Sequence, residues 1–288
     1  MTADSQLLSA RIARLFVYPV KSCAGVELTE AVLTPTGLDL DRAWMVVDEE
    51  GSFVTQRELP RMALVRPQLK RHEVVLRAPG MLALHLSIDA VEEPTRVRVW
   101  DDEVPAYDMG AIAAQWFSDF LGRRLRLVRF DPDHRRLSNL KWTGGVEAPN
   151  QFSDGYPLLV LSEASLAGFN ERLARAGQPP VGIERFRPNL VLAGAEAHDE
   201  DRVVQLRIEA EGGPAVLRLV KPCPRCPIPN IDPATAESSP VVADTLQSYR
   251  RDPRLDGAVT FGMNAIVLEG DERVLRVGQA VQGEWDFG

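Results

Sequence analysis

Glycine and proline break this chain into short segments. Its 288 residues include 21 of each, and both residue types end helices and turn strands. This frequency favours many short strands over a helical bundle. With 45% hydrophobic and 26% charged residues, the composition is that of an ordinary globular protein. The length fits one large domain or two smaller ones.

The first half of the chain is expected to form mostly β-strands. Segments 42–48 and 52–57 flank Asp48-Glu49-Glu50-Gly51, and a four-residue connection that ends in glycine is a common hairpin turn. The further candidate strands are 11–20, 62–65, 73–78, 82–88, 95–100 and 125–130. Strands at this spacing indicate a barrel or a sandwich.

One helix is expected within this half. Its apolar face ends at Gly122, which stands where a C-terminal cap belongs. We interpret the aromatic stripe as core packing. The residues of this face are Ile112, Trp116, Phe117, Phe120 and Leu121.

The chain becomes irregular over 131–150, and we place the domain boundary there. A second helix is expected to begin after Ser162, an N-cap residue, with Glu163 in its first turn. Strands are expected at 190–193, 203–208, 215–220, 258–268 and 273–281, with a short helix at 242–249. The predicted fold class is therefore mainly β with a few helices (α+β).

The net charge of −8 argues against nucleic acid as the main partner, because such binding depends on neutralising phosphates. One stretch is basic although the whole chain is acidic, and we interpret it as a solvated face. It comprises Arg123, Arg124, Arg126, Arg129, Arg135, Arg136 and Lys141.

Cysteine content and hydropathy indicate the compartment. Three cysteines are too few for a disulfide framework and leave one unpaired, so a reduced, intracellular protein is expected. The N-terminus, Met1 to Ala10, is polar and lacks an apolar signal region. No run approaches the roughly 18 apolar residues of a membrane span. We therefore expect a soluble, cytoplasmic protein with no membrane partner.

The run Lys221-Pro-Cys-Pro-Arg-Cys226 is the main chemical signal. A zinc site would need four ligands, and neither Cys23 nor the four histidines stand at metal-ligand spacing. A thioredoxin-like pair would need a helix N-terminus, whereas prolines at 227 and 229 push Cys226 and Ile228 towards extended backbone. A third alternative is two buried cysteines that act as small apolar side chains.

We favour a single thiolate on a stiff loop, presented by Cys226. Three prolines around it lower the entropy lost when the loop is ordered. A free thiol, with a pKa of about 8.5, is only a few per cent thiolate at neutral pH. Lys221 and Arg225 would offset part of that cost. Such a thiolate could bind the metal of a cofactor.

A phosphorylated cofactor would also require cations close to turns of the chain. Candidates are Lys21-Ser22, Asp41-Arg42, Arg57 and Arg187-Pro188-Asn189. Taken singly, each is more often a surface charge. Spacing alone does not assemble them into one site.

Together these stretches resemble the MOSC-domain family, named for the C-terminal domain of molybdenum cofactor sulfurases. The branch is the one that includes the mitochondrial amidoxime-reducing component and its bacterial relatives. The matching residues occur in the family's order and span nearly the whole chain. They are Tyr18-Pro-Val-Lys-Ser22 with Gly25, Gly37 through Asp41-Arg42, Phe53-Val-Thr-Gln-Arg57, Ser162-Glu-Ala-Ser-Leu166, Phe186-Arg-Pro-Asn189, Lys221-Pro-Cys-Pro-Arg-Cys226, Leu246-Gln-Ser-Tyr-Arg250 and Phe261-Gly262.

The resemblance implies an N-terminal MOSC β-barrel domain at 11–130 and a β-barrel-like, molybdenum cofactor-binding MOSC domain at 150–285. Molybdenum–molybdopterin would lie between them, with Cys226 as metal ligand and catalytic residue. Cys223 matches a cysteine that does not bind the metal. The residues implied to bind the cofactor are Lys21, Ser22, Arg42, Arg57, Ser153, Asp154, Arg187, Asn189, Pro224, Arg225 and Asn264.

Two positions depart from the family's pattern. Pro224 replaces a frequent serine and removes a hydroxyl and an N–H donor. Ala236 stands where glycine is usual, so a positive φ there would strain it.

The resemblance implies a molybdenum-dependent oxidoreductase that reduces N-hydroxylated or N-oxide compounds. With three cysteines, no four-cysteine iron–sulfur domain is expected, nor is a membrane anchor. The electron donor would then be a separate soluble protein of ferredoxin, flavoprotein or cytochrome type. Two alternatives stay open: a sulfur carrier or sulfurtransferase with a Cys226 persulfide, and a non-catalytic cofactor carrier. Pyridoxal phosphate binding is not expected.

Overall fold

A computed structural model describes residues 7–90 and 93–286. Most of the polar N-terminus considered above, residues 1–6, therefore lies outside the described part. No helix of the described residues is long and apolar enough to cross a membrane.

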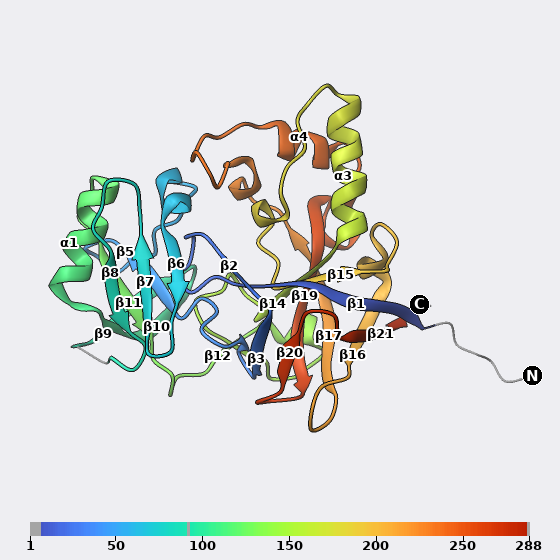
Figure 1. The fold of residues 1–288 in the computed structure, drawn as a ribbon, viewed down its shortest axis with the longest axis horizontal. Coiled ribbons are helices and arrows are strands. Elements are labelled where there is room, and N and C mark those ends of the chain that lie inside the picture. The colour runs from blue at the N-terminus through green and yellow to red at the C-terminus, as the bar shows by residue number, and fades with distance from the viewer. Residues whose placement is uncertain (1–6, 91–92, 287–288) are drawn as a thin grey trace, which may run out of the picture.

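A closed β-barrel of seven strands forms the larger part of the molecule, seen on the right in Figure 1. The strands follow the order β14-β15-β1-β21-β16-β17-β19, and β19 pairs with β14 to close the ring. β18 (Arg251–Asp252) pairs antiparallel with β19, and β2 (Val26–Leu28) pairs with β1. The barrel strands are β1 (Leu8–Val17), β14 (Leu158–Ser162), β15 (Leu190–Ala193), β16 (Val203–Ile208), β17 (Ala215–Pro224), β19 (Ala258–Glu269) and β21 (Ala280–Trp285).

The barrel strands show why this part of the sequence folds as it does. In β16, Val203, Leu206 and Ile208 point into the barrel core, and the residues between them are more exposed. β14 and β15 are buried throughout, because α3 (Glu163–Arg175) covers their outer face. Continuous apolar runs are expected for strands that are buried on both faces.

The N-terminal half contains two further sheets, on the left in Figure 1. One has the order β5-β11-β10-β9 and the other β6-β7-β8. α1 (Gly110–Leu121) packs against them through its aromatic residues. The strands are β5 (Trp44–Val47), β6 (Arg66–Leu69), β7 (Glu73–Arg77), β8 (Leu84–Ser87), β9 (Glu93–Val99), β10 (Asp102–Asp108) and β11 (Arg126–Phe130).

The two halves interlock through strand pairing. β1 comes from the N-terminus but pairs with β15 and β21 of the barrel. β3 (Glu30–Thr34) pairs with β4 (Gly37–Leu38) and with β20 (Val274–Arg276) near the C-terminus. The remaining elements are β12 (Arg136–Leu137), β13 (Pro149–Asn150), α2 (Leu140–Thr143), α4 (Val241–Gln247) and 3-10 turns at Pro60–Leu64, Ile183–Arg185, Asp199–Arg202, Ile228–Asn230 and Pro253–Leu255.

The predicted mainly β fold with few helices is confirmed. So are both long helices: Gly122 ends α1 with φ of 70°, and the Ser162 side chain accepts a hydrogen bond from the backbone N–H of Ser165 at the start of α3. The predicted apolar face of α1 was wrong at one position, because the Ile112 side chain is 80% exposed.

Several predicted strands differ from the structure. Residues 52–57 form no strand: Ser52 and Phe53 make single bridges, and the chain then turns. The strand expected at 62–65 is replaced by the 3-10 turn that Pro60 opens. The strand expected at 273–281 is divided at Gly278 into β20 and β21, which join different sheets. β10 was missed, because Pro105 and acidic residues interrupt its apolar pattern.

Ala236 has φ of 63°, the conformation in which alanine is strained. We expect Ala236→Gly to raise the stability by about 0.5–1 kcal/mol, because glycine adopts positive φ without a Cβ clash. Urea denaturation would measure the change. The control is Ala234→Gly in the same turn, where φ is not positive; it should lower stability slightly. If both variants changed the free energy of unfolding equally, the backbone at Ala236 would not be strained.

Candidate functional site

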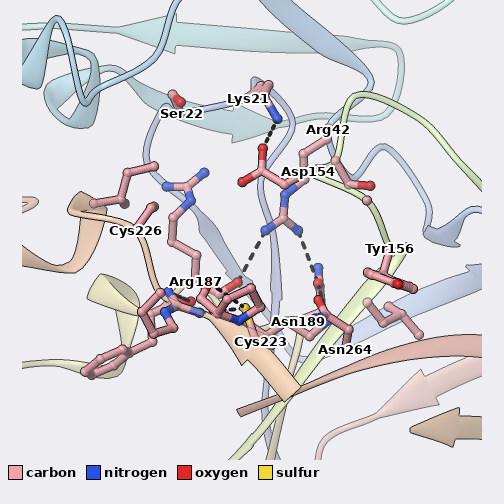
Figure 2. Close-up of a pocket in the computed structure, with 18 of the residues that line it drawn as sticks. Lys21, Ser22, Arg42, Asp154, Tyr156, Arg187, Asn189, Cys223, Cys226 and Asn264 are labelled. Carbon is pink, nitrogen blue, oxygen red and sulfur yellow. Dashed lines mark hydrogen bonds and ion pairs between the residues drawn. The ribbon is translucent and has the colours of Figure 1, made fainter. Parts of the chain in front are cut away.

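A pocket lies where the two halves of the chain meet, and all twelve residues predicted for the site line it. It encloses about 120 Å³, within about 750 Å³ of empty space that opens to solvent. The predicted residues that line it are Lys21, Ser22, Arg42, Arg57, Ser153, Asp154, Arg187, Asn189, Pro224, Arg225, Cys226 and Asn264. We call this space the cysteine pocket (Figure 2).

Three of these residues have a strained backbone. Ser22, Arg42 and Arg187 have φ values of 66°, 53° and 59°, in the left-handed region that residues other than glycine rarely occupy. Hydrogen bonds fix two of these turns: Lys21 N–H donates to Trp44 O, and Arg42 N–H to Tyr18 O, both at 2.8 Å. Strain of this kind concentrates at functional sites.

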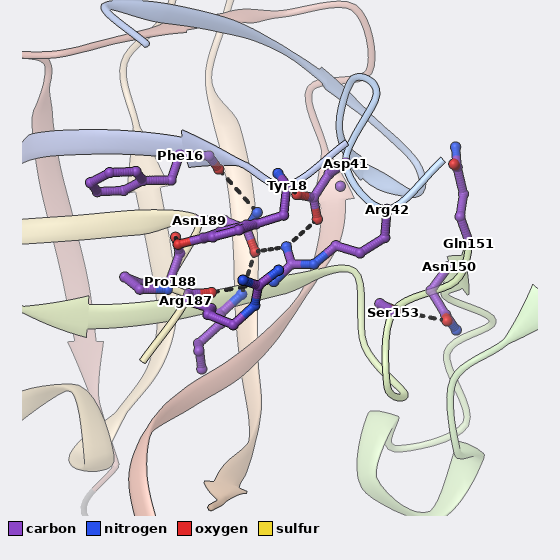
Figure 3. Close-up of polar contacts among 12 residues, drawn as sticks. Phe16, Tyr18, Asp41, Arg42, Asn150, Gln151, Ser153, Arg187, Pro188 and Asn189 are labelled. Atoms are coloured by element: carbon purple, nitrogen blue, oxygen red, sulfur yellow. Dashed lines mark hydrogen bonds and ion pairs between the residues drawn. The ribbon is translucent and has the colours of Figure 1, made fainter. Parts of the chain in front are cut away.

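Asn189 is the centre of the buried polar network in Figure 3. Its Oδ1 accepts hydrogen bonds from Arg42 Nη1 and from the Leu159 N–H, both at 3.1 Å, and its Nδ2 donates to Phe16 O at 3.1 Å. Arg42 also pairs with Asp41 and donates to Arg187 O. One amide side chain therefore joins β1, β14 and the arginine of the pocket.

Tyr18 and Asp41 were not among the residues implied to bind the cofactor, although both stand in the matched motifs. The Tyr18 ring lies 4.3 Å from the Arg42 guanidinium and 4.2 Å from that of Arg187. Burial raises the pKa of Tyr18, so its hydroxyl stays protonated and donates to Pro188 O. Asp41 accepts from Tyr18 N–H at 2.8 Å. Adjacency to Lys21 and Arg42 was the available signal.

Lys21 and Asp154 form an ion pair on one side of the pocket (Figure 2). Lys21 is buried, and its Nζ donates to Phe152 O at 2.7 Å and to Asp154 at 2.5 Å. Burial lowers the pKa of Lys21, and Asp154 opposes that shift. Loss of hydration would raise the pKa of Asp154, but Lys21, Arg57 and Arg42 outweigh this and hold it well below its usual value.

We expect the stability difference between wild type and Asp154→Asn to shrink as the pH falls below about 4. Because the folded pKa is lowered, the contribution of the carboxylate is complete above the unfolded value and is lost as the pH falls through the folded one. The carboxylate is 57% exposed, so solvent screening limits the effect to about 1 kcal/mol or less. Urea denaturation between about pH 3 and 7 tests this. A difference that does not vary with pH would contradict the lowered pKa.

The interpretation of the basic stretch as a solvated face was wrong for Arg136. It is only 7% exposed, and its Nη1 donates to Ser153 O at 2.8 Å, Gln151 O at 2.9 Å and Asn150 Oδ1 at 2.7 Å. The guanidinium therefore fixes the loop that carries Ser153 and Asp154 into the pocket. Its sequence context gave no signal for this role.

Cys226 is half-buried and lines the pocket, and the buried cysteine is Cys23. The sequence predicted that Lys221 and Arg225 stabilise the Cys226 thiolate, but both side chains contact other groups. Arg225 Nη1 lies 3.1 Å from Cys223 Sγ, and Lys221 Nζ lies 5.2 Å from the Trp142 ring centroid. Burial raises the pKa of the Cys223 thiol, and Arg225 only partly opposes this.

The loop after Cys226 also differs from the prediction. Ile228 was expected to be extended, but it opens a 3-10 turn, Ile228–Asn230. Arg225 N–H donates to Val259 O at 2.8 Å, and Arg225 Nη2 donates to Phe186 O at 2.9 Å. These bonds hold the loop against β19 and the chain before β15. Among the described residues, no group of three or more His, Cys, Asp or Glu side chains is placed to hold a metal ion.

The donor set of the cysteine pocket fits an anionic ligand. Five cationic side chains, those of Lys21, Arg42, Arg57, Arg187 and Arg225, line it with the single carboxylate of Asp154. Burial and repulsion by Arg42 lower the pKa of Arg187 to about 10. Within the described residues, Arg57 Nε, Arg225 Nε and Tyr156 Oη are buried without a hydrogen-bond partner. Each such group costs about 1–3 kcal/mol, which ligand acceptors would remove.

Fold and pocket define a mainly β protein whose two halves together line one cationic pocket with a cysteine at its wall. Two family models match the chain: the MOSC N-terminal beta barrel domain over residues 9–124 and the MOSC domain over residues 147–282. The chain therefore belongs to the MOSC-domain family.

Curated relatives agree with this assignment. Mitochondrial amidoxime-reducing component 1 of Mus musculus is 36% identical over 249 residues, which covers 83% of this chain and 71% of the relative. The Homo sapiens protein of the same name is 36% identical over 285 residues, covering 94% and 82%. Molybdenum cofactor sulfurase of Danio rerio is 31% identical over 273 residues, covering 88% of this chain and 32% of the sulfurase.

Proposed function

We propose that this protein binds a molybdenum–pyranopterin cofactor in the cysteine pocket and reduces N-hydroxylated or N-oxide compounds. Two electrons and two protons would convert the N-hydroxyl compound into its N–H form and water. The electrons would come from a separate donor protein of ferredoxin, flavoprotein or cytochrome type. The names of the amidoxime-reducing relatives support this reaction class.

One observation carries the proposal: a half-buried thiol and five cations from both halves of the chain line one pocket. The Nε atoms of two of these cations are buried and have no hydrogen-bond partner within the described part of the chain. A phosphorylated cofactor with a thiophilic metal needs these two kinds of group together. A hydrolytic site would instead need a base beside the cysteine. Among the residues that line the pocket there is no histidine.

Each residue would have a distinct role. Cys226 would bind the metal, which when bound supplies a two-electron, oxygen-accepting centre. Arg42, Arg187 and Asn189 would seat the anionic end of the cofactor, with Ser22 and Asn264 donating hydrogen bonds. Lys21 and Arg57 hold the Asp154 carboxylate beside the pocket. Pro224 could contribute only its carbonyl or its ring. We take 11–130 and 150–285 as the two domains that share this work.

Elemental analysis and a reduction assay test the proposal. Protein made in cells with the cofactor pathway should carry about one molybdenum per chain. It should reduce benzamidoxime with an artificial electron donor. Metal-free wild-type protein without pterin fluorescence would reject it.

The sulfurase relative favours a second candidate, a sulfurtransferase that carries a persulfide on Cys226. The same deprotonated sulfur would serve, because nucleophilic attack and metal binding both need the thiolate. Intact mass after incubation with a cysteine desulfurase distinguishes the two. A gain of one sulfur atom that Cys226→Ser abolishes favours transfer. Bound molybdenum without turnover of N-hydroxylated compounds by any donor would instead identify a cofactor carrier.

A further inference from the structure

Trp100 has a strained backbone in the turn between β9 and β10, on the left in Figure 1. The turn has only two residues, Trp100 and Asp101, because Val99 already pairs with Asp102. Trp100 has φ of 55°, whereas φ of Asp101 is not positive. A two-residue hairpin loop with positive φ at its first residue usually has glycine there, because a Cβ is strained in this conformation. The chain therefore has tryptophan where glycine would be favoured, and strain of this kind concentrates at functional sites.

Core packing does not account for the tryptophan in this turn. Its side chain is 44% exposed, whereas Trp44 is 0% and Trp116 7% exposed. One edge of the contact surface is the ring of Phe53, with 4.9 Å between the ring centroids. The Phe53 N–H donates to Arg98 O at 3.1 Å, which holds the two segments side by side. An aromatic ring that is nearly half exposed gains little from burial alone.

The Trp100 ring also contacts a cation of the cysteine pocket. The Arg57 guanidinium carbon lies 4.9 Å from the ring centroid, a cation–π contact. Arg57 lines the pocket, and its Nη2 is 3.6 Å from Asp154 Oδ2, which is longer than a hydrogen bond. Within the described residues, Arg57 Nε is buried without a hydrogen-bond partner. Because its polar contacts are weak, the position of this guanidinium depends on the ring beside it.

The other four cations of the pocket are fixed differently, by hydrogen bonds to acceptors of the chain. The donors and acceptors are Lys21 Nζ to Phe152 O, Arg42 Nη1 to Asn189 Oδ1, Arg187 Nη1 to Cys23 O and Arg225 Nη2 to Phe186 O. Among the described residues, the Arg57 guanidinium has only the longer ion pair and the indole face. The ring of Trp100 therefore takes the place that hydrogen bonds have for the other cations.

We propose that Trp100 is a positioning residue of the cysteine pocket, and that its indole holds the Arg57 guanidinium where it can donate to an anionic group of the ligand. The inference deepens the proposed function and rests on it for the phosphorylated cofactor. A flat guanidinium can stack on an aromatic face and still present its N–H groups at its edge. The unpartnered Nε–H would then find its acceptor on the ligand, and charge-assisted hydrogen bonds of this kind are strong.

Phosphate binding to the purified, metal-free full chain tests this positioning without turnover. Calorimetry at low ionic strength should find about one inorganic phosphate per chain. Trp100→Gly should weaken the binding about fivefold or more. Its urea midpoint should stay close to that of wild type, because relief of the positive φ offsets the lost ring contacts. Trp100→Phe keeps an aromatic face and should bind phosphate within about twofold of wild type.

A double-mutant cycle shows whether Trp100 acts through Arg57. Arg57→Met should weaken phosphate binding at least as much as Trp100→Gly does. Adding Trp100→Gly to Arg57→Met should change the affinity by less than about twofold, because residues that act through one contact are not additive. The matched control is Glu272→Gly, which relieves a φ of 62° in an exposed turn outside the pocket lining. It should leave the phosphate affinity within about twofold of wild type.

Four results would overturn the inference: no phosphate binding by wild type, wild-type affinity in Trp100→Gly, equal losses in Trp100→Phe and Trp100→Gly, or additive losses in the double variant. The proposed function fails by other measurements. If the phosphate results hold but protein made with the cofactor pathway carries no molybdenum, the positioning of Arg57 stands and the proposed reduction fails. If the loaded protein reduces benzamidoxime while Trp100→Gly binds phosphate normally, only the inference fails.

Discussion

Cys226→Ser should lose nearly all of its molybdenum, falling from about one equivalent per chain to less than about a tenth. The thiolate is the form that binds metals, and a serine hydroxyl stays protonated at neutral pH. The half-buried sulfur lies at a pocket wall whose cations remain in place. Reduction of benzamidoxime should fall by about 100-fold or more, since the reacting metal is absent. Metal analysis and the artificial-donor assay measure both effects.

Cys223→Ser is the matched control for this prediction. It makes the same atomic change three residues away, and Cys223 Sγ contacts the Arg225 guanidinium. We expect this variant to keep most of its molybdenum, because a serine oxygen can still accept from Arg225. If Cys226→Ser and Cys223→Ser lose equal amounts of molybdenum, Cys226 is not the specific metal ligand, and the proposed role of Cys226 is wrong.

Asn189→Leu should destabilise the protein by about 3 kcal/mol, which corresponds to a fall in Tm of about 6–12 °C. The leucine would leave the Leu159 N–H and Phe16 C=O buried without their partner and would free Arg42 from its bond. Each unpaired buried group costs about 1–3 kcal/mol. Cofactor content should fall as well, because Arg42 lines the pocket.

Differential scanning calorimetry and urea denaturation of the metal-free protein measure the Asn189 effect on folding alone. Asn139→Ala is the control: among the described residues its exposed side chain only caps the short helix α2, so it should cost about 1 kcal/mol or less. A similar small cost for Asn189→Leu would mean that the network does not hold the two halves together.

The candidate site was largely predictable because its residues lie in short motifs. Lys21, Arg187 and Cys226 each stand in a local turn that the sequence marks with proline or a polar neighbour. Their meeting in one pocket was not derivable from spacing; the family resemblance supplied it. Arg136 was misinterpreted because its acceptors are backbone carbonyls of residues 151 and 153, whose direction the sequence does not encode.

In the fold, too, features set by neighbouring residues were predicted, and features set by distant parts of the chain were not. The end of α1 at Gly122 and the start of α3 at Ser162 depend on neighbouring residues, and the sequence predicted both. Segments 52–57 and 62–65 have strand-like composition, yet they form turns. The chain turns after Phe53, where Arg57 lines the pocket, and the proline at 60 opens a 3-10 turn.

By itself the sequence determined most of the short strands, the helix caps, the loop that carries Cys226 and the scattered cations, since each depends on residues close together in the chain. Only the tertiary structure decided that β1 joins the C-terminal barrel and that β3 pairs with β20. An alternating strand specifies which face is buried but not its neighbour, because partner choice depends on packing across distant segments. That pairing brings Lys21 and Arg42 beside Arg187, and it creates the pocket.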